Sequence, residues 1–163
     1  MNETDRMIAA NAQYAERFHK GDLATPPARR VAVVTCMDAR IEMALVLGLK
    51  VGDAHIIRNA GGIVTDDVIR SLMISQHLLE TREIMVIQHT GCGMLGFTDS
   101  ELTDKLALET GQRPSFAIGS FADLELNLRE SVERIRSSPF LAETDAVRGF
   151  VFEIETGRLR EVG

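Results

Sequence analysis

The sequence predicts a three-layer α/β fold with a mostly parallel central sheet of four strands, a possible antiparallel edge strand, helices on both faces and an N-terminal helical arm. The strand candidates are continuous apolar runs rather than alternating ones, which is typical of parallel strands that are covered on both faces. Helical segments separate these runs along the chain, as crossover connections require. The 163 residues suffice for one domain with a single core.

An amphipathic helix is expected over residues 4–19, and the segment Gly21–Pro27 ends it because glycine and two prolines cannot continue a helix. Its apolar stripe, which must be buried on the body or on a partner, consists of Ile8, Ala12, Ala15 and Phe18. We therefore expect residues 1–27 to form a helical arm with its linker, and residues 28–163 to form a single α/β domain.

Within this domain, strands are expected at residues 31–35, 55–58, 84–87 and 150–154. Helices are expected at residues 41–47, 65–80, 98–109 and from Ser120 to Pro139. Thr98 with Glu101 fits a capping box, and Ser120 with Asp123 fits another. Residues 150–154 are the candidate for the antiparallel edge strand, and a turn is expected after them.

Composition narrows the function classes. The formal net charge of -6 disfavours nucleic acid as a partner, because phosphate binding needs clustered positive charge. No apolar stretch approaches the roughly 18 residues that cross a bilayer, so no membrane association is expected. With no secretory signal and two cysteines, we expect a reduced, cytoplasmic protein.

Both cysteines and one histidine follow predicted strands. Cys36 comes directly after strand 31–35, and His89 and Cys92 come after strand 84–87. Because the carboxyl ends of parallel strands share one crevice, these side chains can meet. Two thiolates, one imidazole and a free fourth position form a ligand pattern of catalytic zinc, which activates water. The alternatives are two small buried hydrophobic residues or a Cys36–Cys92 disulfide.

Asp38 and Arg40 lie close to Cys36 in sequence and can point into the same crevice. A bidentate arginine keeps a carboxylate ionised. An ionised Asp38 beside zinc could orient zinc-bound hydroxide toward substrate, or it could bind the metal as fourth ligand in a closed state. An ordinary surface ion pair is the alternative.

A glycine-rich segment and a further histidine also bear on the predicted function. Gly91–Gly96 matches a dinucleotide-binding pattern, but no apolar strand ending in an acidic residue follows at the required distance, so nucleotide binding is disfavoured. His55 begins a predicted strand upstream of a glycine-containing turn. We expect this residue near the crevice, where it could relay protons.

Three motifs occur in a specific order: Cys36-Met37-Asp38-Ala39-Arg40, Arg58-Asn59-Ala60-Gly61 and His89-Thr90-Gly91-Cys92-Gly93. This order resembles the β-class carbonic anhydrases, in particular their shorter, mainly prokaryotic branch. The likeness covers nearly all of residues 28–100. An aromatic residue that commonly lines the pocket of this family is replaced by His55.

The resemblance implies Zn2+ on Cys36, His89 and Cys92, an Asp38–Arg40 dyad, and reversible hydration of CO2 to bicarbonate and a proton by residues 28–163. The substrate pocket is expected to include Ala60, Gly61, Gly93 and His55. The resemblance also implies a homodimer or higher homo-oligomer in which the N-terminal arm embraces a partner. Two alternatives remain: a carbonyl sulfide or carbon disulfide hydrolase with the same zinc site, and a non-catalytic zinc-binding module.

Overall fold

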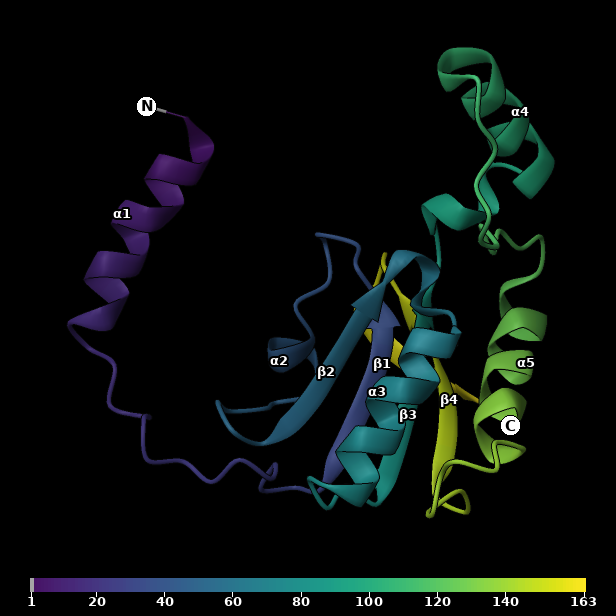
Figure 1. The fold of residues 1–163 in the computed structure, drawn as a ribbon. Coiled ribbons are helices and arrows are strands. Elements are labelled where there is room, and N and C mark those ends of the chain that lie inside the picture. The colour runs from purple at the N-terminus through teal and green to yellow at the C-terminus, as the bar shows by residue number, and fades with distance from the viewer. Residues whose placement is uncertain (1) are drawn as a thin grey trace.

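The computed structural model describes residues 2–163, so Met1, the first residue of the predicted arm, lies outside the described residues. Its centre is a five-stranded sheet in the order β2-β1-β3-β4-β5, shown in Figure 1. The strands are β1 Val31–Cys36, β2 Ala54–Asn59, β3 Glu83–His89, β4 Val147–Glu153 and β5 Arg158–Val162. All neighbouring pairs are parallel except β4 with β5. The predicted α/β class and mostly parallel sheet are confirmed.

The antiparallel edge is β5 and not the segment that was predicted for it. Residues 150–154 belong mainly to β4, which pairs in parallel with β3, as in the register Ile87↔Phe150. The chain then reverses at the predicted turn, and β5 returns antiparallel with Arg160 opposite Val151. The assignment of the edge to residues 150–154 was therefore wrong, because the strand that ends the sheet lies beyond the turn.

The α-helices are α1 Glu3–Ala15, α2 Met43–Val46, α3 Asp66–His77, α4 Asp99–Thr110 and α5 Leu124–Arg136. Two short 3-10 helices are η1 Ala60–Gly62 and η2 Gly93–Leu95. Each expected α-helix is present, with ends that differ by a few residues from the sequence pattern. Within residues 2–163, the length and apolar character of every helix fall short of what a membrane crossing needs.

Helix starts follow the capping chemistry of the sequence at α4 but not at α5. Thr98 and Glu101 form the predicted capping box of α4. At α5 the N-cap is Asp123, whose carboxylate accepts a hydrogen bond from the backbone N–H of Leu126 at 2.9 Å. Ser120 lies ahead of this helix and donates its hydroxyl hydrogen bond to Asp99 instead. The expected helix start at Ser120 was wrong, because both positions offer capping chemistry and only Asp123 adjoins the first helical turn.

The two faces of the sheet are covered unequally. Helices α3 and α5 pack on one face, and their buried side chains form a core with β1, β3 and β4; this core includes Val34, Leu72, Val86, Leu128 and Ile135. The opposite face is covered by α2 and the residues that flank it. Ile41 and Met43 form a second core there with strand residues that include Val33, Ile87 and Phe150. The protein thus has three layers, with the larger core under α3 and α5.

The arm helix α1 stands away from the sheet in Figure 1, and none of its residues is buried. Met7 and Ile8 on this helix are 69% and 63% exposed. The apolar side chains that the sequence pattern places on one face of this helix are therefore not buried against the rest of their own chain.

Candidate metal centre

The order of the strands creates a switch point between β1 and β3. From β1 the chain runs outward to β2 and then returns to the other side of β1 as β3. Loops that leave the carboxyl ends of two such strands diverge, and a crevice opens between them. Cys36 is the last residue of β1, and His89 is the last residue of β3. The topology alone therefore brings these two side chains to one crevice.

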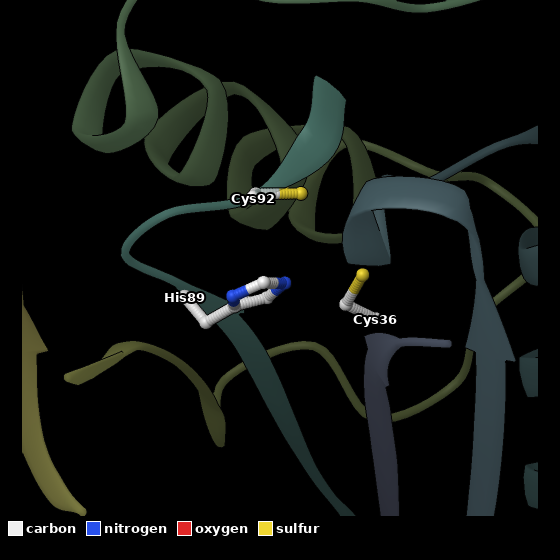
Figure 2. Close-up of side chains that lie close together, drawn as sticks. All are labelled: Cys36, His89 and Cys92. Carbon is white, nitrogen blue, oxygen red and sulfur yellow. The ribbon is translucent and has the colours of Figure 1, made fainter. Parts of the chain in front are cut away.

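Cys92 joins the pair because the chain turns back directly after β3. Gly91 adopts a φ of 62°, which residues other than glycine rarely adopt. The turn at this residue brings Cys92 over the crevice. The ligand atoms of Cys36, His89 and Cys92 all lie within 4.8 Å of one another. Figure 2 shows the two sulfur atoms and the imidazole directed at a common space. Both cysteines are free thiols, so the disulfide alternative was wrong.

His89 has the protonation pattern of a metal ligand. Its side chain is 0% exposed, and its Nδ1–H donates to the backbone carbonyl of Thr90 at 2.8 Å. Because a carbonyl can only accept, Nδ1 carries a proton, and in the neutral ring Nε2 presents a lone pair. In residues 2–163, Nε2 is one of the buried side-chain atoms without a hydrogen-bond partner. A bound cation would satisfy this atom, and the S, N, S donor set suits zinc.

The two thiols differ in acidity. Burial raises the pKa of Cys36, but the His89 imidazole and the backbone N–H groups of Asp38 and Gly61 together lower it from 9.0 to about 7. Burial raises the pKa of the Cys92 thiol, and the neighbouring Cys36 adds to this increase. One thiolate therefore forms readily in this crevice, and a second is opposed by the first until a cation compensates for both charges.

Asp38 and Arg40 form a bidentate pair beside the three ligands. Arg40 donates from Nε to Oδ1 of Asp38 at 2.9 Å and from Nη2 to Oδ2 at 2.7 Å. These bonds hold the pKa of the Asp38 carboxyl far below its usual range, so the group is ionised. Asp38 Oδ2 lies 3.7 Å from His89 Nε2. The predicted carboxylate is therefore next to the ligand cluster, and Arg40 also donates to the carbonyl of Gly91 at 3.1 Å.

The structure separates the predicted pocket residues into two groups. Ala60 packs against the cysteine cluster, Gly61 is buried beside it, and Gly93 follows Cys92 at the start of η2. These three lie at the crevice, whereas their contact with substrate stays a prediction. His55 does not lie there. It pairs in register with Ala32 near the start of β1, and its Nδ1 is 2.7 Å from Ser75 Oγ in α3.

The placement of His55 at the crevice of its own chain was therefore wrong. His55 and Asn59 are four residues apart on β2, and at about 3.3 Å per residue this separates His55 from the carboxyl edge by about 13 Å. A proton relay through His55 in this chain's own crevice is therefore no longer expected.

Sequence reasoning missed several residues that hold the centre. Arg58 donates from Nε to the Cys36 carbonyl at 2.9 Å and from Nη2 to the Asp38 carbonyl at 2.8 Å, so it clamps the first ligand loop. Met94 and Phe121 belong to the same buried apolar cluster as both cysteines. The sequence offered a signal for Arg58, which begins the second motif. It offered none for Phe121, because the spacing of this residue also fits the apolar face of the helix that was predicted from Ser120 to Pro139.

The nucleotide-binding alternative finds no support in the local structure. Gly91–Gly96 contains only the three-residue helix η2, and the next α-helix begins at Asp99. A dinucleotide site needs such a glycine segment to open directly into a long helix whose N-terminus faces the phosphates.

Asp99 fixes the loop that carries Phe121, and its charge predicts a pH dependence. Its carboxylate accepts from the backbone N–H groups of Gly119 and Ser120 at 3.1 and 2.7 Å, and from the Ser120 hydroxyl. These bonds lower the pKa of Asp99. A group whose pKa is lower in the folded state stabilises the fold above its unfolded pKa, about 3.9, and loses this contribution as the pH falls through its folded value.

We expect Asp99→Asn to lower the melting temperature by a few degrees at pH 7, because an amide accepts fewer of these bonds. The deficit should shrink as the pH falls below about 4, where Asp99 protonates first in the unfolded and then, at lower pH, in the folded wild type. Calorimetry at pH 7 and pH 3 measures both. Asp104→Asn, which breaks an exposed pair with Arg113, is the control and should change little. Equal melting temperatures for wild type and Asp99→Asn at pH 7 would contradict the prediction.

Comparison with known proteins agrees with this geometry. Residues 31–113 match the family described as carbonic anhydrase. Beta-carbonic anhydrase 1 of Mycobacterium tuberculosis is 50% identical over 162 residues, which are 99% of this chain and 99% of that protein. The chain belongs to the carbonic anhydrase family. Zinc is the cofactor of its β-class, and the buried Cys36, His89 and Cys92 donors fit that ion.

Structural relatives extend the picture. The crystal structure of carbonic anhydrase from Streptococcus mutans matches this carbonic anhydrase fold with a TM-score of 0.94 and 43% identity, covering 100% of this chain and 99% of that one. A carbon disulfide hydrolase from Acidianus sp. is 38% identical over 173 residues, covering 91% of this chain and 83% of that protein. The same family therefore includes proteins named for two different substrates.

Proposed function

We propose that Cys36, His89 and Cys92 bind one zinc ion, and that Asp38 and Arg40 complete a site for the reversible hydration of CO2 to bicarbonate and a proton. The observation that carries this proposal is the buried convergence of two thiols with an imidazole nitrogen that has no hydrogen-bond partner. When bound, zinc supplies the Lewis acidity that activates water at neutral pH.

The residues of this chain orient the reaction. The ionised Asp38 accepts a hydrogen bond from the water nucleophile and directs its lone pair at the carbon of CO2. A bond forms between that oxygen and carbon, and the proton of the water leaves to buffer. Arg40 occupies both oxygens of Asp38 and so keeps this carboxylate ionised and outside the ligand set. The role of Asp38 as fourth ligand in a closed state would require part of this pair to break.

The apolar wall positions CO2 and limits competing water. Ala60, Met94 and Phe121 supply this wall next to the cysteines. Gly61 lets Met94 and Phe121 pack closely, since a Cβ there would lie 3.0 and 3.1 Å from them, whereas a Cβ at Gly93 would meet nothing within 4 Å. CO2 is small and carries no net charge, so an apolar wall suits it better than a polar one. We assign the binding of CO2 to these contacts.

Stopped-flow CO2 hydration on protein with measured zinc content tests the proposal. We expect activity that depends on zinc, and Asp38→Asn should retain zinc while losing about 100-fold or more in kcat/KM. Asp104→Asn removes a carboxylate from a similar arginine pair on α4 and should keep full activity. Zinc-loaded protein without hydration at any pH would identify a non-catalytic zinc module and refute the enzymatic role.

Carbonyl sulfide or carbon disulfide hydrolysis is the second candidate, and the relationship to carbon disulfide hydrolase from Acidianus sp. favours including it. The same zinc site would serve both reactions. Sulfide release from these substrates, measured on the same preparation, distinguishes the two candidates. We expect the CO2 rate to exceed sulfide release by a wide margin, since the relative of highest identity among those named above is a carbonic anhydrase.

We further propose that residues 1–27 form an arm that docks on a second copy of residues 28–163, giving a homodimer or a higher homo-oligomer. A 13-residue helix is marginal in water by itself, and α1 buries no residue on its own body. The body exposes apolar side chains near the sheet edge at Leu45, Val51 and Ile56, which offer a surface of matching character. We propose a cytoplasmic location as well, because free thiols persist in a reducing compartment.

Ile8→Glu should convert the oligomer to monomer, because it places a charge in the centre of the apolar stripe. Gln13→Glu adds the same charge on the opposite side of α1 and should leave the assembly intact. Light scattering after size-exclusion chromatography measures both masses. An Ile8→Glu variant with the mass of wild type would contradict docking through this stripe.

A further inference from the structure

The orientation of the His89 ring depends on a single backbone carbonyl. Its Nδ1–H donates to Thr90 O at 2.8 Å, and this is the one hydrogen bond that the ring makes in residues 2–163. The other nitrogen, Nε2, faces the ligand cluster and lies 3.7 Å from Asp38 Oδ2. The ring is buried, so solvent cannot replace this bond. A displacement of the Thr90 carbonyl would therefore turn the ring or allow the other tautomer, whose Nε2 carries a proton and cannot bind a metal.

Thr90 forms three hydrogen bonds with the end of β4 and the turn that follows it. Its backbone N–H donates to Phe152 O at 3.0 Å. Its Oγ1 accepts from the backbone N–H of Ile154 at 3.0 Å and donates to Glu155 Oε2 at 2.9 Å. Two of the three bonds belong to the side-chain hydroxyl. Without that hydroxyl, only the bond to Phe152 would restrain the residue.

The restraint acts at the start of a turn, in which Arg40 Nη2 also donates to the next carbonyl, that of Gly91, at 3.1 Å. β3 ends at His89, and the peptide that carries the Thr90 carbonyl leads into Gly91, which has a positive φ and where an added Cβ would meet nothing within 4 Å. Glycine lowers the barrier to rotation of this peptide. The hydroxyl of Thr90 counteracts that freedom by fixing Thr90, the residue before Gly91, to the turn that follows β4.

We propose that Thr90 is a positioning residue whose hydroxyl holds the carbonyl that sets the tautomer and orientation of His89. The inference rests on the proposed zinc ligation by His89. Groups that orient a metal-bound histidine typically change metal affinity 10- to 100-fold when they are removed. Glu155 belongs to the same device, because its carboxylate accepts from the hydroxyl.

The test compares Thr90→Val with wild type in zinc affinity and in the 15N NMR spectrum of the reduced, zinc-free protein. Valine keeps the shape of threonine and removes both hydroxyl bonds. We expect the zinc Kd to rise about 10-fold or more. We also expect the His89 signals to change from a single Nδ1–H tautomer to a mixture, and Thr90→Ser to restore both values.

Thr156→Val is the matched control. Thr156 Oγ1 also donates to a glutamate, Glu153 Oε2, at 2.8 Å and accepts from the backbone N–H of Arg158 at 3.3 Å. It lies in the same turn and makes no bond to the segment that carries His89. This variant should bind zinc as wild type does, although it loses the same two kinds of bond.

A Thr90→Val protein that binds zinc within twofold of wild type and keeps one tautomer would overturn the inference. If Thr90→Val does not fold, Glu155→Ala takes its place, with an expected rise in zinc Kd of about threefold for one lost bond. An unchanged Kd in that variant would also refute it. Wild-type protein that binds no zinc would refute the ligand set instead, and the NMR comparison would still decide the role of Thr90.

Discussion

Cys36→Ser should contain no stoichiometric zinc and should hydrate CO2 at least about 100-fold more slowly than wild type. A serine hydroxyl does not ionise near neutral pH, whereas the Cys36 thiol has a pKa of about 7. The variant would retain only one thiolate and one imidazole at a crevice built for three donors. Zinc content by elemental analysis, stopped-flow rates and circular dichroism together measure the effect.

Thr35→Val is the control for this substitution. Thr35 precedes Cys36 on β1 and is 1% exposed, and its hydroxyl is a buried atom without a hydrogen-bond partner in residues 2–163. Replacement of such a hydroxyl by a methyl group of the same shape is nearly neutral. We expect this variant to keep zinc and activity. A Cys36→Ser protein with one equivalent of zinc and normal rates would show that the cluster is not the metal centre.

Gly62→Ala should destabilise the protein by about 3 kcal/mol or more and release zinc, because backbone atoms surround this position. A Cβ would lie 2.9 Å from Cys36 N, 2.9 Å from the carbonyl carbon of Thr35 and 3.1 Å from Ile87 O. The first two belong to the end of β1, which carries the first ligand. No side chain can move aside to relieve such contacts, so the strand end itself must shift.

Gly48→Ala separates this crowding from the conformational cost of a positive φ. Both glycines have a φ of 61°, but a Cβ at Gly48 would meet nothing within 4 Å. We expect Gly48→Ala to cost only about 1 kcal/mol and to leave zinc binding unchanged. Urea denaturation and zinc titration of both variants provide the comparison. Equal losses of stability would indicate that crowding near Cys36 is unimportant.

The metal centre was predictable from sequence because its donors sit at the ends of strongly apolar strands. Residues 31–35 and 84–87 are continuous runs, and the convergence of their carboxyl ends follows from parallel pairing. The bidentate Asp38–Arg40 contact follows from their spacing of two residues. The clamp by Arg58 depends on the register between β1 and β2, which places Arg58 opposite Thr35 and which the motif alone does not specify.

The errors have physical causes as well. β5 is a short edge strand in which three of five residues are charged and only Val162 is buried, so its pattern is weaker than that of a buried strand. His55 was placed by its sequence distance from the second motif, although a few residues of extended chain span most of a sheet. Ser120 and Asp123 offer similar capping chemistry, and the sequence pattern does not reveal that Ser120 bonds to Asp99 while Asp123 caps α5.

Because neighbouring strands carry two of the three donors, the sheet holds those atoms in place whether or not the ion is there. Filling the centre then demands little rearrangement of the polypeptide, in contrast to short peptides that become ordered only around their metal. Chelation and reloading should accordingly be repeatable on the same sample, with the backbone serving as a permanent template for the ion.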